Sequence, residues 1–247
     1  LPDSRNPLGE EGDAELCGAA TARINADRDV RCAILTGAGR AFSAGGNLKA
    51  MREKAGAFAG SAMAIREGYR RGIHRMVRAI WDIEVPLIAA VNGPAIGLGN
   101  DVACLADIRV AADTAIFGAT FLKVGLVPGD GGAWILPRVI GTSRAAEMFF
   151  TADTIDAATA LQWGLVSKVV AAEQLMEEAR ALAARICRQP PDVLRMTKRL
   201  MREGQGASFE AIMEMSAAMQ SLAHQTKDHT EAVSAFFEKR EPLFKGE

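Results

Sequence analysis

The sequence is poor in cysteine and has no excess of charge of either sign. Its four cysteines (Cys17, Cys32, Cys104 and Cys187) lie far apart among apolar residues and form no Cys-x-x-Cys motif. We therefore expect reduced thiols, and neither a structural zinc site nor a disulfide framework. The 29 basic and 30 acidic residues are interspersed and give a net charge of −1. A polybasic surface for nucleic acid or for membranes is not expected.

Long apolar runs are also missing. The most apolar stretch, residues 85–108, is interrupted by polar residues, glycine and proline, so it is too broken to cross a bilayer. No signal peptide is visible, and no metal-ligand cluster stands out. We expect a soluble cytoplasmic protein without a bound metal. The chain opens without Met, at Leu1–Pro7, in a segment typical of the middle of a loop, so we expect strands that precede it to be absent.

Strand-length apolar runs alternate with helix-like segments over the first two thirds of the chain. The expected strands are 31–36, 87–91, 107–112 and 165–170, and the expected helices between them are 60–84, 98–105 and 143–151. This alternation predicts an α/β architecture. From 172 onward we expect only helices, at 173–188, 191–203, 207–225 and 228–239. The predicted organisation is therefore an α/β core over 1–171 and a helical region over 172–247.

Two glycine-containing segments each follow an apolar run and precede an expected helix start. They are residues 40–49, with Asn47 as an N-cap, and residues 92–101, where Leu98 opens the helix. The first N–H groups of a helix have no partner inside the helix and favour negative charge. Two such segments aimed at one point would form an oxyanion hole. The simpler alternative is loops that only require small residues.

Two aspartates accompany these loops. Asp101 falls in the first turn of the second expected helix, and Asp130 stands among glycines in a third loop, residues 127–132. Each carboxylate has an ordinary structural explanation, as a charge at a helix start or as an N-cap. Each is also a candidate for proton transfer next to a bound ligand.

Many of these motifs occur in the same order in the crotonase superfamily, also called the enoyl-CoA hydratase/isomerase family. The sequence resembles that family from about residue 28 to its end, in segments 35–46, 88–93, 106–111, 125–129, 136–138, 160–166 and 235–245. The resemblance implies a spiral of ββα units with a helical C-terminal region that builds trimers or dimers of trimers. It implies an acyl-CoA thioester as substrate, with coenzyme A as part of that substrate and no separate cofactor.

The resemblance also assigns residues. The backbone amides of Ala44 and Leu98 fall at the oxyanion-hole positions, where they would stabilise a thioester enolate. Substrate contacts are expected from Ser43, Gly45, Gly46, Asn47, Leu48, Gly97 and Phe121, and in a neighbouring subunit from Phe244 and Lys245.

The sequence departs from the family at the acid/base positions. Typical hydratases hold a water with two glutamates, but here the first position is Asp101 and the second is Phe121, which cannot transfer a proton. Some family members have an acting aspartate at the position of Gly129, and Asp130 follows it directly. His74 falls near a histidine that is catalytic in the family's dehalogenase; the alternative is an ordinary helix residue.

Three functions remain open from the sequence. The first is a hydratase that uses Asp101 and Asp130 for the proton transfers, with Phe121 shaping an apolar acyl pocket. The second is a double-bond isomerase, which needs a single carboxylate and no bound water. The third is an inert acyl-CoA-binding protein that keeps the fold.

Overall fold

The computed structural model describes all residues, 1–247, and its centre is a parallel four-stranded sheet. The strands lie in the order β2 (Ala33–Thr36), β4 (Leu87–Val91), β6 (Ile108–Ala112) and β9 (Lys168–Val170). The four strands predicted from the apolar runs are confirmed, with ends that differ by up to three residues. Every residue of β4 is buried, as expected for a central parallel strand covered on both faces.

Shorter strands form two further pairings next to this sheet. One pairing joins β1 (Pro7–Leu8) to β3 (Gly45–Gly46), and the other has the order β5 (Ala95–Ile96), β7 (Ile116–Gly118), β8 (Thr154–Asp156). An isolated bridge between Ser43 and Ala95 links the two pairings. The first glycine-containing segment is thereby held beside the second.

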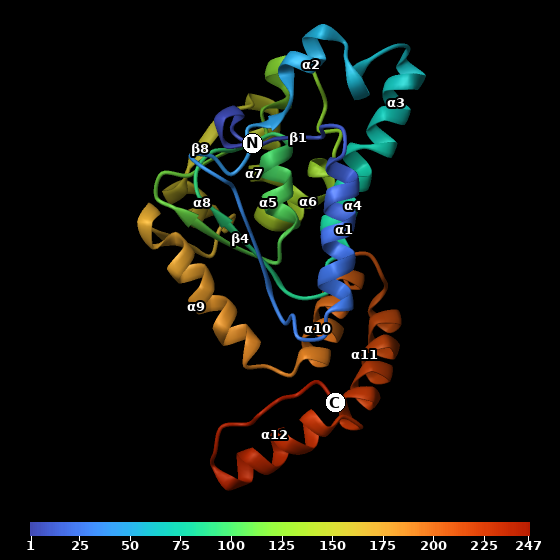
Figure 1. The fold of residues 1–247 in the computed structure, drawn as a ribbon, viewed down its shortest axis with the longest axis vertical. Coiled ribbons are helices and arrows are strands. Elements are labelled where there is room, and N and C mark those ends of the chain that lie inside the picture. Colours follow the sequence, from blue (N-terminus) through green and yellow to red (C-terminus); the bar gives the residue numbers. More distant parts are fainter.

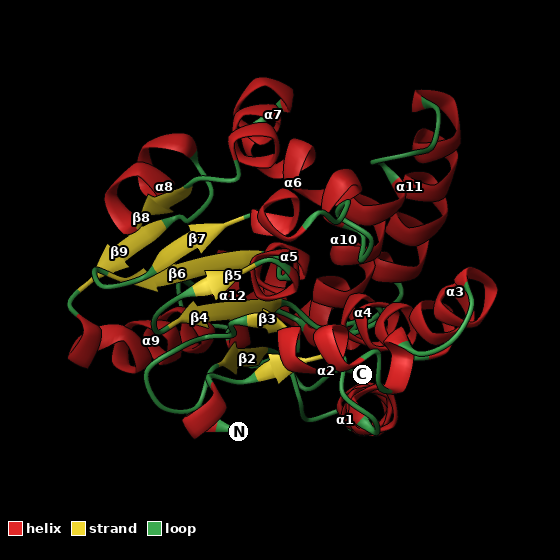
Figure 2. Cartoon of the chain, turned by 90° about the horizontal axis from the view of Figure 1, so that it is seen from above, coloured by secondary structure: helices red, strands yellow, loops and turns green.

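Helices enclose these strands. The sheet lies on one side of α5 (Leu98–Leu105), and α1 (Asp13–Ala26), α3 (Ala62–Arg71) and α4 (Ile73–Trp81) lie on the other (Figure 2). All eight residues of α5 are buried, and its apolar side chains belong to the main hydrophobic core. The remaining helices of this part are α2 (Leu48–Glu53), α6 (Gly132–Ile140), α7 (Thr142–Thr151) and α8 (Ala157–Trp163).

The prediction of one helix over 60–84 is wrong, because Gly72 divides it into α3 and α4. The φ and ψ angles of Gly72 are −101° and −91°, outside the helical region. Glycine reaches such backbone angles at little steric cost. The break changes the direction of the chain between Tyr69 and His74, and both residues contact the loop that carries Asp130.

After β9 the chain forms helices only. They are α9 (Leu175–Cys187), α10 (Pro191–Glu203), α11 (Phe209–His224) and α12 (Lys227–Glu238), close to the predicted bounds. Leu175 and Ala179 of α9 pack in a second hydrophobic cluster against β4 and β6. By contrast, α11 has no buried residue. Figure 1 shows α11 and α12 extending away from the α/β core.

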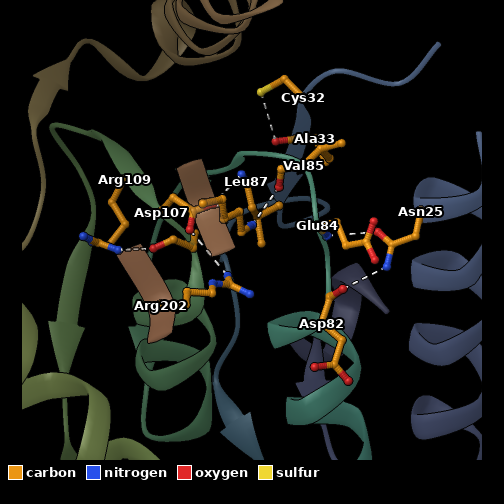
Figure 3. Close-up of polar contacts among 12 residues, drawn as sticks. Asn25, Cys32, Ala33, Asp82, Glu84, Val85, Leu87, Asp107, Arg109 and Arg202 are labelled. Atoms are coloured by element: carbon orange, nitrogen blue, oxygen red, sulfur yellow. Dashed lines mark hydrogen bonds and ion pairs between the residues drawn. The ribbon is translucent and has the colours of Figure 1, made fainter. Parts of the chain in front are cut away.

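A polar cluster at the N-terminal ends of the central strands β4 and β6 attaches α10 to the core. Asp107 accepts a hydrogen bond from the Leu87 amide at 2.7 Å and forms ion pairs with Lys198, at 2.7 Å, and Arg202, at 3.4 Å (Figure 3). Lys198 also donates to the Val85 carbonyl at 2.7 Å. Because Lys198 is buried, these contacts replace the water that its ammonium group would otherwise bind.

None of the helices combines the length and the apolar character that a bilayer-crossing helix requires.

Candidate functional site

A pocket opens where β3, the start of α5 and the loop before α6 meet. Seventeen residues line it, eleven of them hydrophobic. Eight residues predicted from the sequence line this pocket: Ala44, Gly45, Gly46, Leu48, Gly97, Leu98, Phe121 and Asp130. The fold therefore brings together three loops that are far apart in the sequence.

Glycines allow the first two loops to approach each other. A Cβ atom at Gly45, whose φ is +86°, would lie 2.5 Å from the Ile96 carbonyl oxygen and 3.5 Å from the Leu98 nitrogen. Gly97, the N-cap of α5, has φ +55° and ψ −121°, a conformation open only to glycine. A side chain at position 45 would push the two loops apart. The simpler explanation of these glycines, that the loops need small residues, is thus correct, and it places the backbone of both loops at the pocket.

The amide of Leu98 is free to bind a ligand. Leu98 is the first residue of α5, and its N–H donates to no acceptor within the chain. Its apolar side chain belongs to the core and is only 2% exposed, so the only polar group that Leu98 can offer a ligand is its backbone amide. An unpaired N–H at a helix start favours an anionic oxygen.

The prediction that Ala44 supplies the second amide is wrong. The N–H of Ala44 donates to the Arg5 carbonyl at 2.9 Å. Arg5 and Asn6 have φ values of +62° and +52°, which turn the chain back towards residues 38–44. This turn could not be foreseen from the glycine-containing segment alone, because the acceptor lies in a different part of the sequence.

Two residues further along, the amide of Gly46 is the remaining candidate in this segment. The Gly45 N–H donates to the hydroxyl of Ser43 at 3.1 Å, and that hydroxyl donates to the Asn6 carbonyl at 2.8 Å. Outside the β1–β3 pairing, the Gly46 N–H has no acceptor, and Gly46 lines the pocket. By elimination, Gly46 and Leu98 are the candidate pair of donors.

Asp101 and Asp130 come together below this pair. Their side chains interact directly, Asp101 is 1% exposed, and Asp130 is 6% exposed. Asp101 Oδ2 and Asp130 Oδ1 have no hydrogen-bond partner, while Asp101 Oδ1 accepts from Asn100 at 3.3 Å. A buried oxygen without a partner is rare enough in native proteins to mark a place where a ligand or a proton is expected.

Burial controls the protonation of this pair. It raises the pKa of Asp101 well above the usual range, and the neighbouring charge of Asp130 adds to the effect. Burial also raises the pKa of Asp130, although the hydrogen bond with Asp101 and the charge of His74 offset part of the rise. Two carboxylates in contact resist being ionised together, so the pair tends to share one proton.

Only Asp130 of this pair lines the pocket. Asp101 lies behind it, against Gly132, where an added Cβ would overlap the Asp101 carboxylate. Asp130 is not the N-cap of α6, since that position belongs to Gly131. The structure thus brings the two predicted carboxylates together but gives them unequal access to a ligand.

The loop that carries Asp130 is held by the broken helix pair α3–α4. His74 Nε2 lies 2.7 Å from the Gly129 carbonyl, which can only accept, so this nitrogen carries a proton. On the other side, a Cβ at Gly129 would lie 3.4 Å from the ring of Tyr69. His74 does not line the pocket, but Tyr69 does. The sequence reasoning missed Tyr69; Gly72 in the middle of an expected helix was the available signal.

The other predicted residues are distributed as follows. Phe121 and Leu48 contribute to the apolar wall, as predicted. Asn47 caps α2 by accepting from the Ala50 amide at 3.0 Å, and it does not line the pocket. Phe244 and Lys245 lie at the C-terminal end, where the Phe244 carbonyl accepts from Arg31 and the Lys245 amide donates to Asp228. Their predicted contact with a neighbouring subunit stays a prediction.

No group of three or more His, Cys, Asp or Glu side chains lies close enough together to hold a metal ion. The polar chemistry that the site offers is therefore that of backbone amides, a carboxyl pair and two hydroxyls, from Tyr69 and Thr120.

Comparisons with known proteins point to one family. Residues 2–247 match the family described as Enoyl-CoA hydratase/isomerase. A crotonyl-CoA hydratase of Syntrophomonas wolfei is 36% identical over 98% of this chain and 91% of its own length. A 1,2-epoxyphenylacetyl-CoA isomerase of Escherichia coli is 34% identical over 99% and 92%. The crystal structure of an enoyl-CoA hydratase from Bacillus anthracis superposes with a TM-score of 0.92 at 32% identity, covering 100% of this chain and 93% of that one.

Proposed function

The chain belongs to the enoyl-CoA hydratase/isomerase family and has the crotonase fold, and we propose that it hydrates a 2-enoyl-CoA thioester through an enolate. The observation that carries this proposal is the meeting of a free helix-start amide, Leu98, with a pocket-lining carboxyl, Asp130. In this proposal, coenzyme A arrives as part of the substrate, and no separate cofactor is required.

The Leu98 and Gly46 amides would bind the thioester oxygen. Negative charge grows on that oxygen as the enolate forms, and fixed donors in a site with little water stabilise such charge by several kcal/mol. Because the donors are backbone groups held by Gly45 and Gly97, they need no rearrangement during the reaction.

Asp130 would carry the proton. As a carboxylate it takes one hydrogen of a water molecule as a proton, while the water oxygen bonds to the β-carbon and the double-bond electrons move into the thioester. The same proton then passes to the α-carbon, and the thioester carbonyl forms again. A raised pKa suits Asp130 to this exchange, because a group that must both accept and donate works best near the ambient pH.

Asp101 does not touch the substrate in this scheme. Since it lies behind Asp130 and does not line the pocket, it acts through Asp130. It is a positioning residue that shares a proton with the catalytic carboxyl.

Double-bond isomerisation is the second candidate. It needs one carboxyl that removes and returns a proton, and Phe121 occupies the place where typical hydratases have their second glutamate. Among the relatives, the Escherichia coli protein is named an isomerase. The same enolate serves both reactions, and the difference is whether a water is held at the β-carbon.

Assembly and location are part of the proposal. The helical region 172–247 exposes Phe236, Phe237 and other apolar side chains on α11 and α12, which suits contacts between identical subunits in a trimer or a dimer of trimers. The cytoplasmic location expected from the sequence also stays a prediction.

The test uses two substrates and one carboxamide variant. Hydration of crotonyl-CoA removes the conjugated absorbance, and isomerisation of a 3-enoyl-CoA creates it. We expect Asp130→Asn to lower kcat/KM by about 10²- to 10⁴-fold, the usual contribution of a general acid–base group. Asp113→Asn, on an exposed acid that does not line the pocket, is the matched control and should keep full activity. Undiminished turnover in Asp130→Asn, or no reaction of the parent protein with either substrate, would refute the proposal.

A further inference from the structure

The pocket contains one titratable side chain besides Asp130. It is Tyr69, the only tyrosine of the chain, on the last turns of α3. Its hydroxyl makes no hydrogen bond within the chain, although the side chain is half-buried. A hydroxyl at a pocket wall that has no partner within the chain is available to a ligand or to a water molecule in that pocket.

The position of Tyr69 is fixed by its neighbours rather than by a hydrogen bond. Its ring meets Phe58 edge to face, with centroids 6.0 Å apart, and His74 in the same way at 6.1 Å. The ring also packs against Gly129, the residue before Asp130. Tyr69 therefore lies beside the loop residue that directly precedes Asp130.

The two groups are also electrostatically coupled. The negative charge of Asp130 adds to burial in raising the pKa of the Tyr69 phenol. Tyr69 thus stays neutral while Asp130 exchanges its proton, and its hydroxyl can both accept and donate a hydrogen bond.

We infer that Tyr69 is the second group that holds the attacking water, in the role that a second carboxylate would have where this chain has Phe121. This inference rests on the proposed hydration. One hydrogen of the water points to Asp130 and leaves with it as a proton. The other hydrogen is donated to the Tyr69 oxygen and remains on the hydroxyl group of the product. With both hydrogens held, a lone pair of the water oxygen faces the β-carbon, and no proton is gained or lost by Tyr69.

Hydration and isomerisation should differ in their need for the Tyr69 hydroxyl. Isomerisation moves a proton through Asp130 alone, so it does not need the Tyr69 hydroxyl. Hydration does need it, because one carboxyl fixes only one hydrogen of the water. Loss of the hydroxyl should therefore affect hydration far more than isomerisation.

The experiment compares Tyr69→Phe and Tyr69→Leu with the parent protein on crotonyl-CoA and on a 3-enoyl-CoA. Tyr69→Phe keeps the ring that packs against Gly129 and removes only the oxygen. We expect it to lower kcat for hydration about 10- to 100-fold, the effect of one lost hydrogen bond to a reacting group, with KM within about 3-fold. Isomerisation by Tyr69→Phe should stay within about 3-fold of the parent, whereas Tyr69→Leu should lower both reactions because it also loosens the Asp130 loop.

Other outcomes decide against the inference. Full hydration by Tyr69→Phe would show that the ring alone matters. Equal losses of both reactions in Tyr69→Phe would show a structural role. A hydration loss in Thr120→Val instead would assign the hydroxyl to the other candidate in the pocket. If the parent protein isomerises but does not hydrate, the Tyr69 inference fails together with hydration, while the enolate chemistry stands. If it does neither, the proposed function fails as a whole.

Discussion

The α/β core encloses polar side-chain atoms that have no partner, whereas α11 and α12 enclose none and expose several large apolar side chains. Asn100 Oδ1, Asp101 Oδ2 and Asp130 Oδ1 are enclosed with no hydrogen-bond partner. Phe236 and Phe237 on α12 are 79% and 77% exposed. Both are costly arrangements in an isolated chain. The first marks the place of a polar ligand, and the second marks a surface suited to another protein chain.

The contacts of Lys198 with Asp107 and with the Val85 carbonyl join the C-terminal helices to the α/β core. Breaking them should have the largest effect on stability. Lys198→Met removes the cation that pairs with Asp107 at 2.7 Å and the donor to the Val85 carbonyl. We expect the free energy of unfolding to fall by about 3 kcal/mol, because a partly buried carboxylate loses a partner. Chemical denaturation followed by circular dichroism measures this change.

An exposed ion pair of the same length provides the control. Lys227 and Glu247 also lie 2.7 Å apart, but their side chains are 80% and 53% exposed. Lys227→Met should change the unfolding free energy by less than about 1 kcal/mol. Equal losses of unfolding free energy in the two variants would show that the buried ion pair of Lys198 contributes no more than the exposed ion pair of Lys227.

The buried carboxyl pair should give the core a pH dependence that the C-terminal helices lack. Because the pKa of Asp101 is raised in the folded state, its contribution to stability is fully present below the pKa of the unfolded chain and is lost as the pH rises through the folded pKa. Asp101→Asn removes this loss. At pH 7 we expect the variant to be more stable than the parent by about 1 to 3 kcal/mol, the usual cost of an unsatisfied buried polar group.

Asp156 provides a control of opposite sign. It caps α8, and its hydrogen bonds with Thr159 lower its pKa. Its contribution is therefore present above the unfolded pKa and is lost as the pH falls. Melting temperatures between about pH 2 and pH 8 should show the parent losing its advantage over Asp156→Asn below about pH 4, the ordinary aspartate pKa, and falling behind Asp101→Asn at high pH. If the melting temperatures of the parent and of Asp101→Asn change in parallel with pH, the pKa of Asp101 does not change on folding and the prediction is wrong.

The exposed aromatic pair should have the smallest effect on the stability of the isolated chain. Substitution of both Phe236 and Phe237 by serine should change it by less than about 0.5 kcal/mol, since the side chains contact mainly solvent and each other. The same variant should lower the mass of the assembly in light scattering. Phe150→Ser, on an equally exposed phenylalanine of α7, is the control; loss of assembly in this variant alone would place the interface on the core.

The sequence predicted most of what local patterns determine. The four sheet strands, the helices after residue 172, and the caps at Asn47 and Asp156 follow from apolar runs and side-chain preferences within a few residues. Family resemblance located the pocket at residues 43–48 and 97–101. Leu98 has a free amide because it starts a helix, which is also a local property.

The errors arise where distant segments meet. Ala44 looked available because its acceptor, the Arg5 carbonyl, is far away in the sequence. Asp101 and Asp130 were both expected to transfer protons, but Asp101 packs against Gly132 and only Asp130 lines the pocket. Tyr69 was missed because its approach to the Asp130 loop depends on the break at Gly72, and the helical pattern on either side of Gly72 concealed it.

The turn at Arg5 and Asn6 has a practical consequence for handling the protein. These residues line no part of the pocket, yet they accept the Ala44 N–H and support the Ser43 hydroxyl. A proteolytic cut within this turn would release the Ala44 amide, a spare backbone donor, next to the pocket. Cut and intact molecules in one sample should then behave as two catalytic populations, so the intact mass of a preparation is worth checking before its kinetics are measured.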